Sequence, residues 1–206
     1  MFRAFPSTDD DDDDDHHKHA VATKTWHYYS GPGGDLENLR LFTGNSNPEL
    51  ATEIAHYLGL NLSPATVGRF SDGEIKIQVH ENVRQKHVFV IQPVSSPVND
   101  TLVELLLMIS TLRRASAAEI TAVIPYYGYE RQDRKLASRV PISAADVAIM
   151  LEEMGVDRVV AVDLHGGQIG GFFPPSVPVE NLESTPIGQE DGVHTYMQIE
   201  HKDRGA

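Results

Sequence analysis

A basic segment interrupts a sequence that is otherwise acidic. Residues 126–139, the basic loop, read YYGYERQDRKLASR, while the whole chain has a formal net charge of −13. The cations of the loop are Arg131, Arg134, Lys135 and Arg139. A local basic cluster that opposes the global charge is typical of a site for anions such as phosphate groups. The apolar run at 120–124 predicts a buried strand, so the segment leaves the sheet directly after it.

Three side chains of the basic loop could contact a phosphorylated ligand in different ways. Arg131 offers a planar fork for two hydrogen bonds to one phosphate, Gln132 can donate to an oxygen or a base, and Lys135 is a mobile charge. The alternative is a solvated loop in which the cations pair with Glu130 and Asp133. Position favours a binding site, because ligands of α/β sheets bind beyond the carboxyl ends of the strands.

A carboxylate and an imidazole close the next predicted strand. We expect residues 158–165 to form a buried strand, which would direct Asp163 and His165, two positions apart, to the same face. Such a pair can hold a divalent cation, or the histidine can contact phosphate directly. The alternative is a histidine hydrogen-bonded at the strand end and an aspartate that caps the next turn. The glycine-rich segment at 166–171 favours a binding role, because glycine allows a ligand to approach the backbone closely.

An aromatic ring and two carboxylates lie together in a predicted hairpin turn. Residues 75–79 alternate between apolar and polar side chains, which predicts a half-exposed strand, and residues 71–73 form the turn before it. Phe70 could stack on a purine, while Asp72 or Glu74 accepts a hydrogen bond from an exocyclic amine. The alternative is a tight turn without a ligand.

Strands alternate with helices along residues 40–182, and this order positions the candidate residues. The predicted strands are 40–43, 68–70, 75–79, 87–91, 120–124 and 158–165, and the predicted helices end at Gly59, near Arg114 and at Gly155. This alternation predicts a doubly wound α/β fold: a parallel sheet with helices on both faces and a projecting β-hairpin. We expect the basic loop and Asp163–His165 to open on the same side of this sheet, because one helix joins the two preceding strands.

Local signals mark where the three predicted helices begin. We expect Asn47 to cap the first helix, with Pro48 at its first position. Asn99 or Asp100 is expected to cap the second. The third opens with residues 143–146, Ser-Ala-Ala-Asp, which resemble a capping box with Asp in place of Glu.

Composition bounds the class of protein. The chain has 206 residues, 40% hydrophobic and 23% charged, which fits one ordinary domain. It has no cysteine, which excludes disulfides, thiolate zinc sites and cysteine nucleophiles. The acidic balance argues against nucleic acid as a partner. No apolar run approaches the ~18 to 20 residues of a membrane span, and residues 1–8 lack the apolar stretch of a signal peptide, so we expect a cytoplasmic protein.

The first 39 residues differ from the rest of the sequence. They contain an unbroken run of aspartates at Asp9–Asp15, a histidine-rich patch at 16–19 and a Gly/Pro segment at 31–34, with few apolar side chains to bury. Such a composition predicts a disordered extension. The His and Asp side chains could collect metal ions, and the simpler interpretation is a solvated tail.

Several motifs of the chain occur together, in the same order and spacing, in one known family. They are Phe70–Glu74 (FSDGE), Arg131–Asp133 (RQD), Ser138–Ala144 (SRVPISA), Asp163–His165 (DLH), Gln168–Ile169 (QI) and Gly171–Phe173 (GFF). Between about residues 40 and 182 the sequence resembles the amino-terminal half of ribose-phosphate pyrophosphokinase, also called phosphoribosyl pyrophosphate synthetase. The resemblance implies a phosphoribosyltransferase-like α/β fold.

That family transfers the diphosphoryl group of ATP to ribose 5-phosphate, with Mg²⁺, and forms phosphoribosyl pyrophosphate and AMP for nucleotide biosynthesis. By this resemblance, the residues that bind ATP would be Phe70, Asp72, Gly73, Glu74, Arg131 and Gln132. The residues at the Mg²⁺ would be His165 and Asp163. The residues that support the phosphates would be Arg134, Lys135 and Arg139. In the family the hairpin is lent across a subunit interface, which implies an oligomer.

The sequence departs from the family pattern in three places, and the acidic segment before Arg40 is one of them. Pro174–Ser176 follows the Phe172–Phe173 pair where the family commonly has an acidic residue, while Glu180 retains the later acid. The acidic phosphoribosyl loop and the basic catalytic segment of the family's second half are not found in residues 183–206, which we expect to be an irregular tail. We therefore expect an impaired diphosphokinase that lacks most of the ribose 5-phosphate site. The alternative is a noncatalytic ATP-binding or regulatory subunit that assembles with full-length synthetase.

Overall fold

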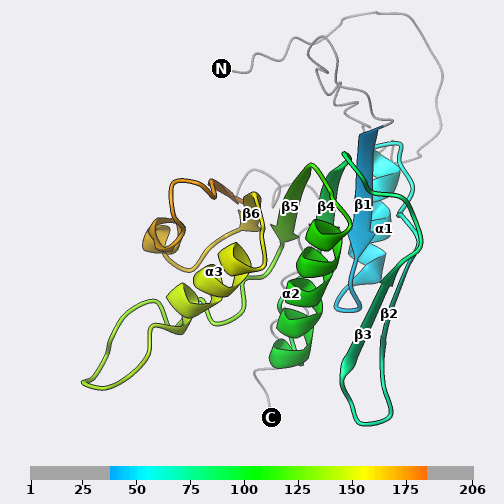
Figure 1. Cartoon of the computed structure of the whole chain (residues 1–206). Helices are drawn as coiled ribbons and strands as arrows, with labels where there is room; N and C mark the ends of the chain where they lie inside the picture. Colours follow the sequence, from blue (N-terminus) through cyan, green and yellow to red (C-terminus); the bar gives the residue numbers. More distant parts are fainter. Residues whose placement is uncertain (1–37, 185–206) are drawn as a thin grey trace, which may run out of the picture. The chain divides into compact units, whose positions relative to one another are not determined.

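A five-stranded parallel sheet forms the centre of the fold (Figure 1). In the computed structural model, which describes residues 38–184, its strands are β1 Leu39–Thr43, β4 His87–Ile91, β5 Glu119–Ile124, β6 Arg158–Val162 and β7 Val179–Leu182. They lie in the order β1-β4-β5-β6-β7, and each neighbouring pair is parallel. The carboxyl ends of all five strands therefore lie along one edge of the sheet, where ligands of such folds bind.

Helices cover both faces of the sheet, because each strand presents alternate side chains to opposite faces. The helices are α1 Pro48–Tyr57, α2 Val98–Arg114 and α3 Ser143–Glu153. Val88 and Val90 of β4 belong to the larger core, which includes buried residues of α2 and α3. Ile91 instead belongs to a smaller core with residues of β1 and α1. The predicted doubly wound α/β fold with helices on both faces is confirmed.

An antiparallel hairpin, β2 Ala65–Arg69 and β3 Ile75–Val79, projects beside α2 (Figure 1). Its half-buried inner side chains pack on the larger core, which supports a hairpin that would be marginal alone. An ion pair fastens its end to α2, with Arg69 Nη2 2.9 Å from Asp100 Oδ2. The prediction of a projecting hairpin is confirmed.

The start of α1 follows its sequence signal, and the start of α2 does not. Asn47 Oδ1 accepts a hydrogen bond from Leu50 N at 3.0 Å, so the predicted cap of α1 is confirmed. The capping prediction for α2 is wrong, because this helix follows Pro97 and already contains Asn99 and Asp100 in its first turn. Proline has a fixed φ and no N–H group to satisfy, which suits the start of a helix.

The capping box predicted for α3 is also wrong. Ser143 lies inside the helix, after Ile142, and no side chain caps the first turn. The Ser143 hydroxyl instead donates to Gln132 Oε1 at 2.7 Å. The serine therefore fastens the basic loop to the helix rather than closing the helix end.

A buried polar cluster joins the turn after β1 to α2. Glu104, which is 3% exposed, accepts hydrogen bonds from Asn45 N at 3.0 Å, Asn45 Nδ2 at 3.1 Å and Gln92 Nε2 at 3.0 Å. Gln92 Oε1 in turn accepts from Ser46 N at 3.3 Å. Gly44 is required beside it, because a Cβ atom there would collide with the Gln92 side chain. The cluster fixes the chain where it leaves β1.

Two predictions concern segments at the ends of the chain. Of the extension predicted for residues 1–39, only Asn38 and Leu39 are described, and Leu39 already belongs to β1. The irregular tail predicted for 183–206 is described only as far as Ser184, so the remainder of both segments lies outside the described residues. In the part of the chain that is described, no helix is both long enough and apolar enough to span a bilayer.

Candidate functional site

Two loops meet at the carboxyl edge of the sheet. The basic loop lies between β5 and α3, and residues 163–172, the histidine loop, follow β6. Glu130 Oε2 accepts a hydrogen bond from His165 N at 3.2 Å, and Asp133 Oδ2 accepts one from Gln168 Nε2. The prediction that these segments open on the same side of the sheet is confirmed, and hydrogen bonds join them directly.

The cations of the basic loop lie at the surface. The exposed cations are Arg131, Arg134, Lys135 and Arg139. Arg134 forms an ion pair with the buried Asp133, 3.2 Å from Nε to Oδ1, as the alternative of a solvated loop required. Glu130 has a further role that this alternative does not include, because its Oε2 accepts a hydrogen bond from the histidine loop. Exposed cations at this edge form a surface that can receive an anion.

Gln132 holds the basic loop against α3. Its Oε1 accepts a hydrogen bond from Ser143 Oγ at 2.7 Å, and its backbone carbonyl accepts one from Ala144 N at 3.2 Å. Because the side-chain oxygen is engaged, Gln132 can offer a ligand its NH₂ group. This orientation agrees with the donor role that the sequence predicts.

Tyr127 anchors the base of the basic loop. Its ring is 1% exposed and meets Phe173 edge to face, and its hydroxyl donates to Ala144 O at 3.1 Å. Burial raises the pKa of the Tyr127 phenol, so the group remains a hydrogen-bond donor. Gly128 allows the loop to pass Val94, because a Cβ atom at this position would lie 2.7 Å from Val94 O. The loop is therefore closely packed where it leaves the sheet.

The expected arrangement of Asp163 and His165 is wrong. β6 ends at Val162, and Asp163 has φ +47°, so the alternation of a strand does not continue to His165. Asp163 turns toward the end of β7, where Oδ1 accepts from Ser184 N at 2.9 Å and Oδ2 accepts from Ser184 Oγ. Asp163 thus caps a turn, which is close to the alternative of an aspartate without a ligand. His165 is exposed on the histidine loop.

The donor set at this edge does not form a metal site by itself. Within residues 38–184, no three His, Asp or Glu side chains come together around a position for a metal ion. Mg²⁺ prefers oxygen ligands and is commonly bound through substrate phosphates with one or two carboxylates. Both oxygens of Asp163 already hold Ser184. The residues present therefore fit Mg²⁺ only as a supplement to phosphate oxygens.

The histidine loop contains a 3₁₀ helix, Gly167–Phe172. Within this loop, the glycines whose Cβ position has no atom within 4 Å are Gly167, Gly170 and Gly171. Their open surroundings suit close approach of a ligand to the backbone, as predicted. Gly166 has a different role: a Cβ atom there would lie 2.7 Å from Gln168 Nε2, so this glycine makes room for the side chain that reaches Asp133.

The hairpin tip is a closed turn with an exposed ring. Asp72 Oδ1 accepts a hydrogen bond from Glu74 N at 3.1 Å, and Gly73 has φ +93°, a conformation that favours glycine. Phe70 is 52% exposed, and Lys76 Nζ lies 5.8 Å from its ring centroid. The turn thus uses one oxygen of Asp72 and leaves an aromatic surface that can meet a planar ligand.

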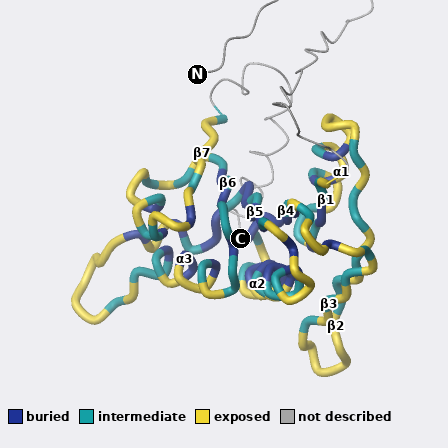
Figure 2. Tube along the Cα trace, turned by 45° about the horizontal axis from the view of Figure 1, so that its top comes forward, coloured by how far each residue is buried: buried dark blue, intermediate teal, exposed yellow. Residues whose placement is uncertain are grey.

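The hairpin tip and the basic loop lie on opposite flanks of α2 (Figure 1, Figure 2). Both views show the β2–β3 hairpin on one flank and the loop before α3 on the other, and Figure 2 shows both tips as exposed. The residues predicted to bind ATP therefore fall into two separate groups. Within the described residues, one chain does not bring these groups together.

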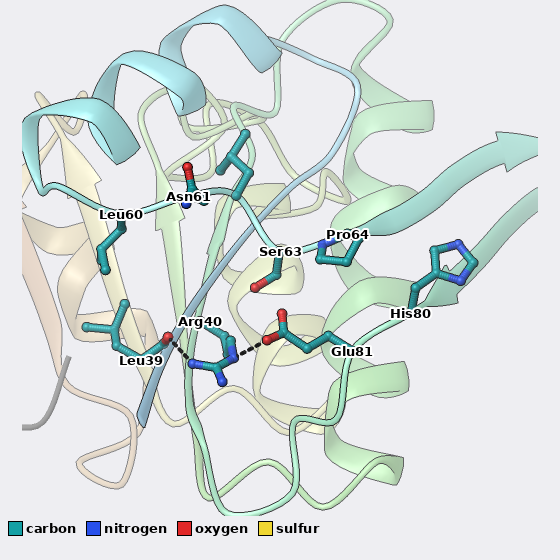
Figure 3. Close-up of a pocket in the computed structure, with 9 residues that line it drawn as sticks. Leu39, Arg40, Leu60, Asn61, Ser63, Pro64, His80 and Glu81 are labelled. Carbon is teal, nitrogen blue, oxygen red and sulfur yellow. Dashed lines mark hydrogen bonds and ion pairs between the residues drawn. The ribbon is translucent and has the colours of Figure 1, made fainter. Parts of the chain in front are cut away.

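A surface hollow of about 410 Å³ lies beside the start of β1 and the base of the β2–β3 hairpin (Figure 3). Leu39, Leu60 and Leu62 contribute apolar walls, and Arg40 Nε lies 2.5 Å from Glu81 Oε1 at its rim. Leu39 and Arg40 open β1, so the hollow lies at the amino end of this strand, whereas the basic loop follows the carboxyl end of the parallel β5. No predicted site residue lines the hollow.

Sequence reasoning missed the residues that join the two loops. Glu130 and Asp133 were considered only as partners of nearby cations, and Gln168 had no role beyond its motif. A signal for these contacts was available in the sequence. The basic loop contains acidic side chains after one buried strand, and an amide side chain follows the next parallel strand. β7 was also missed: Glu180 there pairs with Arg158 of β6, 3.0 Å from Oε1 to Nη1.

The fold and the site define an α/β protein whose parallel sheet carries two charged, hydrogen-bonded loops at its carboxyl edge. Residues 39–155 match the family described as the N-terminal domain of ribose phosphate pyrophosphokinase. Because this match covers more than half of the 206 residues, the chain belongs to the ribose-phosphate pyrophosphokinase family.

Individual relatives agree with the family match. The chain is 56% identical over 166 residues to a ribose-phosphate pyrophosphokinase of Wolinella succinogenes, across 81% of this chain and 52% of that protein. It is 53% identical over 147 residues to one of Helicobacter pylori, across 71% of this chain and 46% of the relative. A crystal structure of phosphoribosylpyrophosphate synthetase from Mycobacterium smegmatis is similar with a TM-score of 0.72 and 42% identity, across 77% of this chain and 53% of that chain. The chain spans about half the length of these relatives.

Proposed function

We propose that this chain supplies the ATP-binding part of a ribose-phosphate diphosphokinase. Such an enzyme transfers the diphosphoryl group of ATP to the anomeric hydroxyl of ribose 5-phosphate and releases phosphoribosyl pyrophosphate and AMP. Family membership supports the reaction class, and residues 40–182 would form the domain that carries the ATP site. The observation that carries the proposal is the pair of joined loops, which places the basic loop beside His165 at the carboxyl edge.

The exposed residues of this edge suit the triphosphate of MgATP. Arg131 would contact a phosphate through its planar fork. Gln132 would donate from its NH₂ group, because its side-chain oxygen is the atom that bonds to Ser143. The cations that would add electrostatic support are Arg134, Lys135 and Arg139. Transfer of phosphoryl-type groups depends mainly on positioning and charge neutralisation, which these residues and a phosphate-bound Mg²⁺ can supply. His165 would lie where the phosphate-bound metal meets the protein, and Asp163 would join it through the oxygen lone pairs that its bonds to Ser184 leave available.

The second group of ATP-binding residues would come from another chain. Phe70 would stack on adenine, and the carboxylates of Asp72 and Glu74 would accept from its amino group, with Gly73 shaping the turn. The separation of the hairpin tip from the basic loop favours this arrangement, since a tip on one flank can meet the edge of a neighbouring copy. The proposed assembly is a homo-oligomer, or a hetero-oligomer with full-length synthetase.

The proposal is tested by MgATP binding and AMP formation. We expect the purified chain to bind MgATP in isothermal titration calorimetry, and to form AMP slowly or not at all when ribose 5-phosphate is added. Absence of MgATP binding at millimolar concentrations would refute the proposal. The alternative function, a noncatalytic subunit, predicts that the chain co-elutes with a full-length synthetase in size-exclusion chromatography and changes its rate without forming AMP itself.

A further inference from the structure

The two hydrogen bonds that join the loops share one register. Glu130 bonds to His165 and Asp133 bonds to Gln168, and both pairs are separated by 35 positions in the sequence. The basic loop and the histidine loop therefore run side by side over an interval of three residues. Arg131 and Gln132 lie between the two carboxylates in sequence, so each bond flanks the residues proposed to hold ATP.

Both carboxylates are buried, although the loop around them is exposed. Glu130 is 9% exposed and Asp133 is 4% exposed, whereas Arg131 and Gln132 between them are exposed. Removing a carboxylate from water is costly unless hydrogen bonds or cations compensate it. Hydrogen bonds from the neighbouring loop reach both carboxylates, and Arg134 lies 3.2 Å from Asp133 Oδ1, an oxygen that accepts no hydrogen bond within the described residues.

The surrounding structure makes room for this contact. Gly166 has no Cβ atom to collide with the Gln168 side chain, which folds back and donates to Asp133. On the other side, Gln132 is fixed to Ser143 of α3, so the basic loop is held by the helix while its two carboxylates hold the histidine loop. The hydrogen bonds thus join α3 to the basic loop at Gln132, and they join the basic loop to the histidine loop at the adjacent Asp133.

We propose that Glu130 and Asp133 are positioning residues that fasten the histidine loop to the basic loop, so that His165 and Arg131 are presented together to a phosphorylated nucleotide. The role in nucleotide binding rests on the proposed function, and the fastening rests on the contacts alone. A carboxylate accepts only, and it accepts here from a backbone N–H and from an amide, so either bond weakens when the acceptor loses its charge and is lost when the donor is replaced by a second acceptor.

A reciprocal exchange of side chains tests the Asp133–Gln168 bond. In Asp133→Asn the acceptor loses its charge and keeps a single amide oxygen, which weakens the bond, and in Gln168→Glu a carboxylate faces a carboxylate, which abolishes it. The double variant Asp133→Asn/Gln168→Glu restores one amide and one carboxylate with the roles reversed. Asp146→Asn is the matched control, since Asp146 is an exposed aspartate in the first turn of α3.

Amide hydrogen exchange of residues 163–172 in the ligand-free chain tests the fastening without ATP. We expect roughly tenfold faster exchange in Gln168→Glu, a smaller increase in Asp133→Asn, recovery in the double variant to within about threefold of the unchanged chain, and no change in Asp146→Asn. Unchanged exchange in both single variants, or a double variant no better than the singles, would overturn the fastening. Thermal unfolding of each variant separates a local opening from a loss of global stability.

The affinity for MgATP, measured on the same proteins, tests the positioning role. We expect roughly tenfold weaker binding in Gln168→Glu, a smaller loss in Asp133→Asn and recovery in the double variant. Normal affinity despite faster exchange would overturn the positioning role. If the unchanged chain does not bind MgATP, the proposed function fails, and the exchange data still decide whether the carboxylates fasten the two loops.

Discussion

Replacing Arg131 by alanine should weaken the binding of MgATP by roughly 30- to 150-fold, because a guanidinium on phosphate is expected to contribute about 2–3 kcal/mol. Arg131 is exposed at the carboxyl edge, between the two buried carboxylates that join the loops. Arg131→Lys keeps the charge but loses the planar fork, so we expect an intermediate loss of affinity. Isothermal titration with MgATP at fixed ionic strength measures both variants.

The control for this prediction is Arg114→Ala. Arg114 is also an exposed arginine, but it lies in the last turn of α2, which leads to the amino end of β5, whereas the basic loop follows the carboxyl end of that strand. Its removal changes the net charge by the same amount and should leave affinity within about twofold, since distant surface charges are largely screened by salt. If both variants lose affinity equally, the basic loop contributes only general charge, and the specific role of Arg131 is wrong.

The second large effect is on stability and concerns Glu104. Glu104→Ala should lower the free energy of unfolding by about 3–5 kcal/mol, because it leaves buried donors without their acceptor and opens a void. The donors are Asn45 N, Asn45 Nδ2 and Gln92 Nε2, each within 3.1 Å of the carboxylate. Urea denaturation followed by circular dichroism gives the change from the midpoint and slope.

An exposed glutamate on another helix serves as the comparison. Glu53 lies on α1 and is exposed, so Glu53→Ala should change stability by no more than about 0.5 kcal/mol. A loss below about 1 kcal/mol for Glu104→Ala would mean that water replaces the carboxylate at little cost, contrary to its burial. The result therefore measures how firmly the turn after β1 is held to α2.

Much of the fold could be predicted from the sequence because its signals are local. Apolar runs and spacing along one segment mark β4 and β5, and the oxygen of Asn47 lies three residues from the N–H that it caps. The parallel sheet then follows from the alternation of strands and helices. In turn, the parallel sheet brings the basic loop and the histidine loop to one edge, as the structure confirms.

The details of the candidate site could not be predicted, because distant residues determine them. Asp163 leaves the strand conformation with φ +47° and bonds to Ser184, a partner 21 positions away. Glu130 and Asp133 bond to residues 35 positions away. Periodicity reports which face of one element is buried, and it does not report which side chain of a later loop will accept or donate a hydrogen bond.

Because the hairpin tip and the basic loop lie on opposite flanks of α2, nucleotide binding should depend on the concentration of the chain. If the two groups of ATP-binding residues belong to different chains, ATP binds the assembled form, and its apparent affinity falls as the chain is diluted. By reciprocity, saturating ATP strengthens the association of the chains by the same factor by which association raises the affinity for ATP. MgATP titrations at two well-separated chain concentrations should therefore give different apparent affinities, whereas identical values would place the whole nucleotide site within one chain.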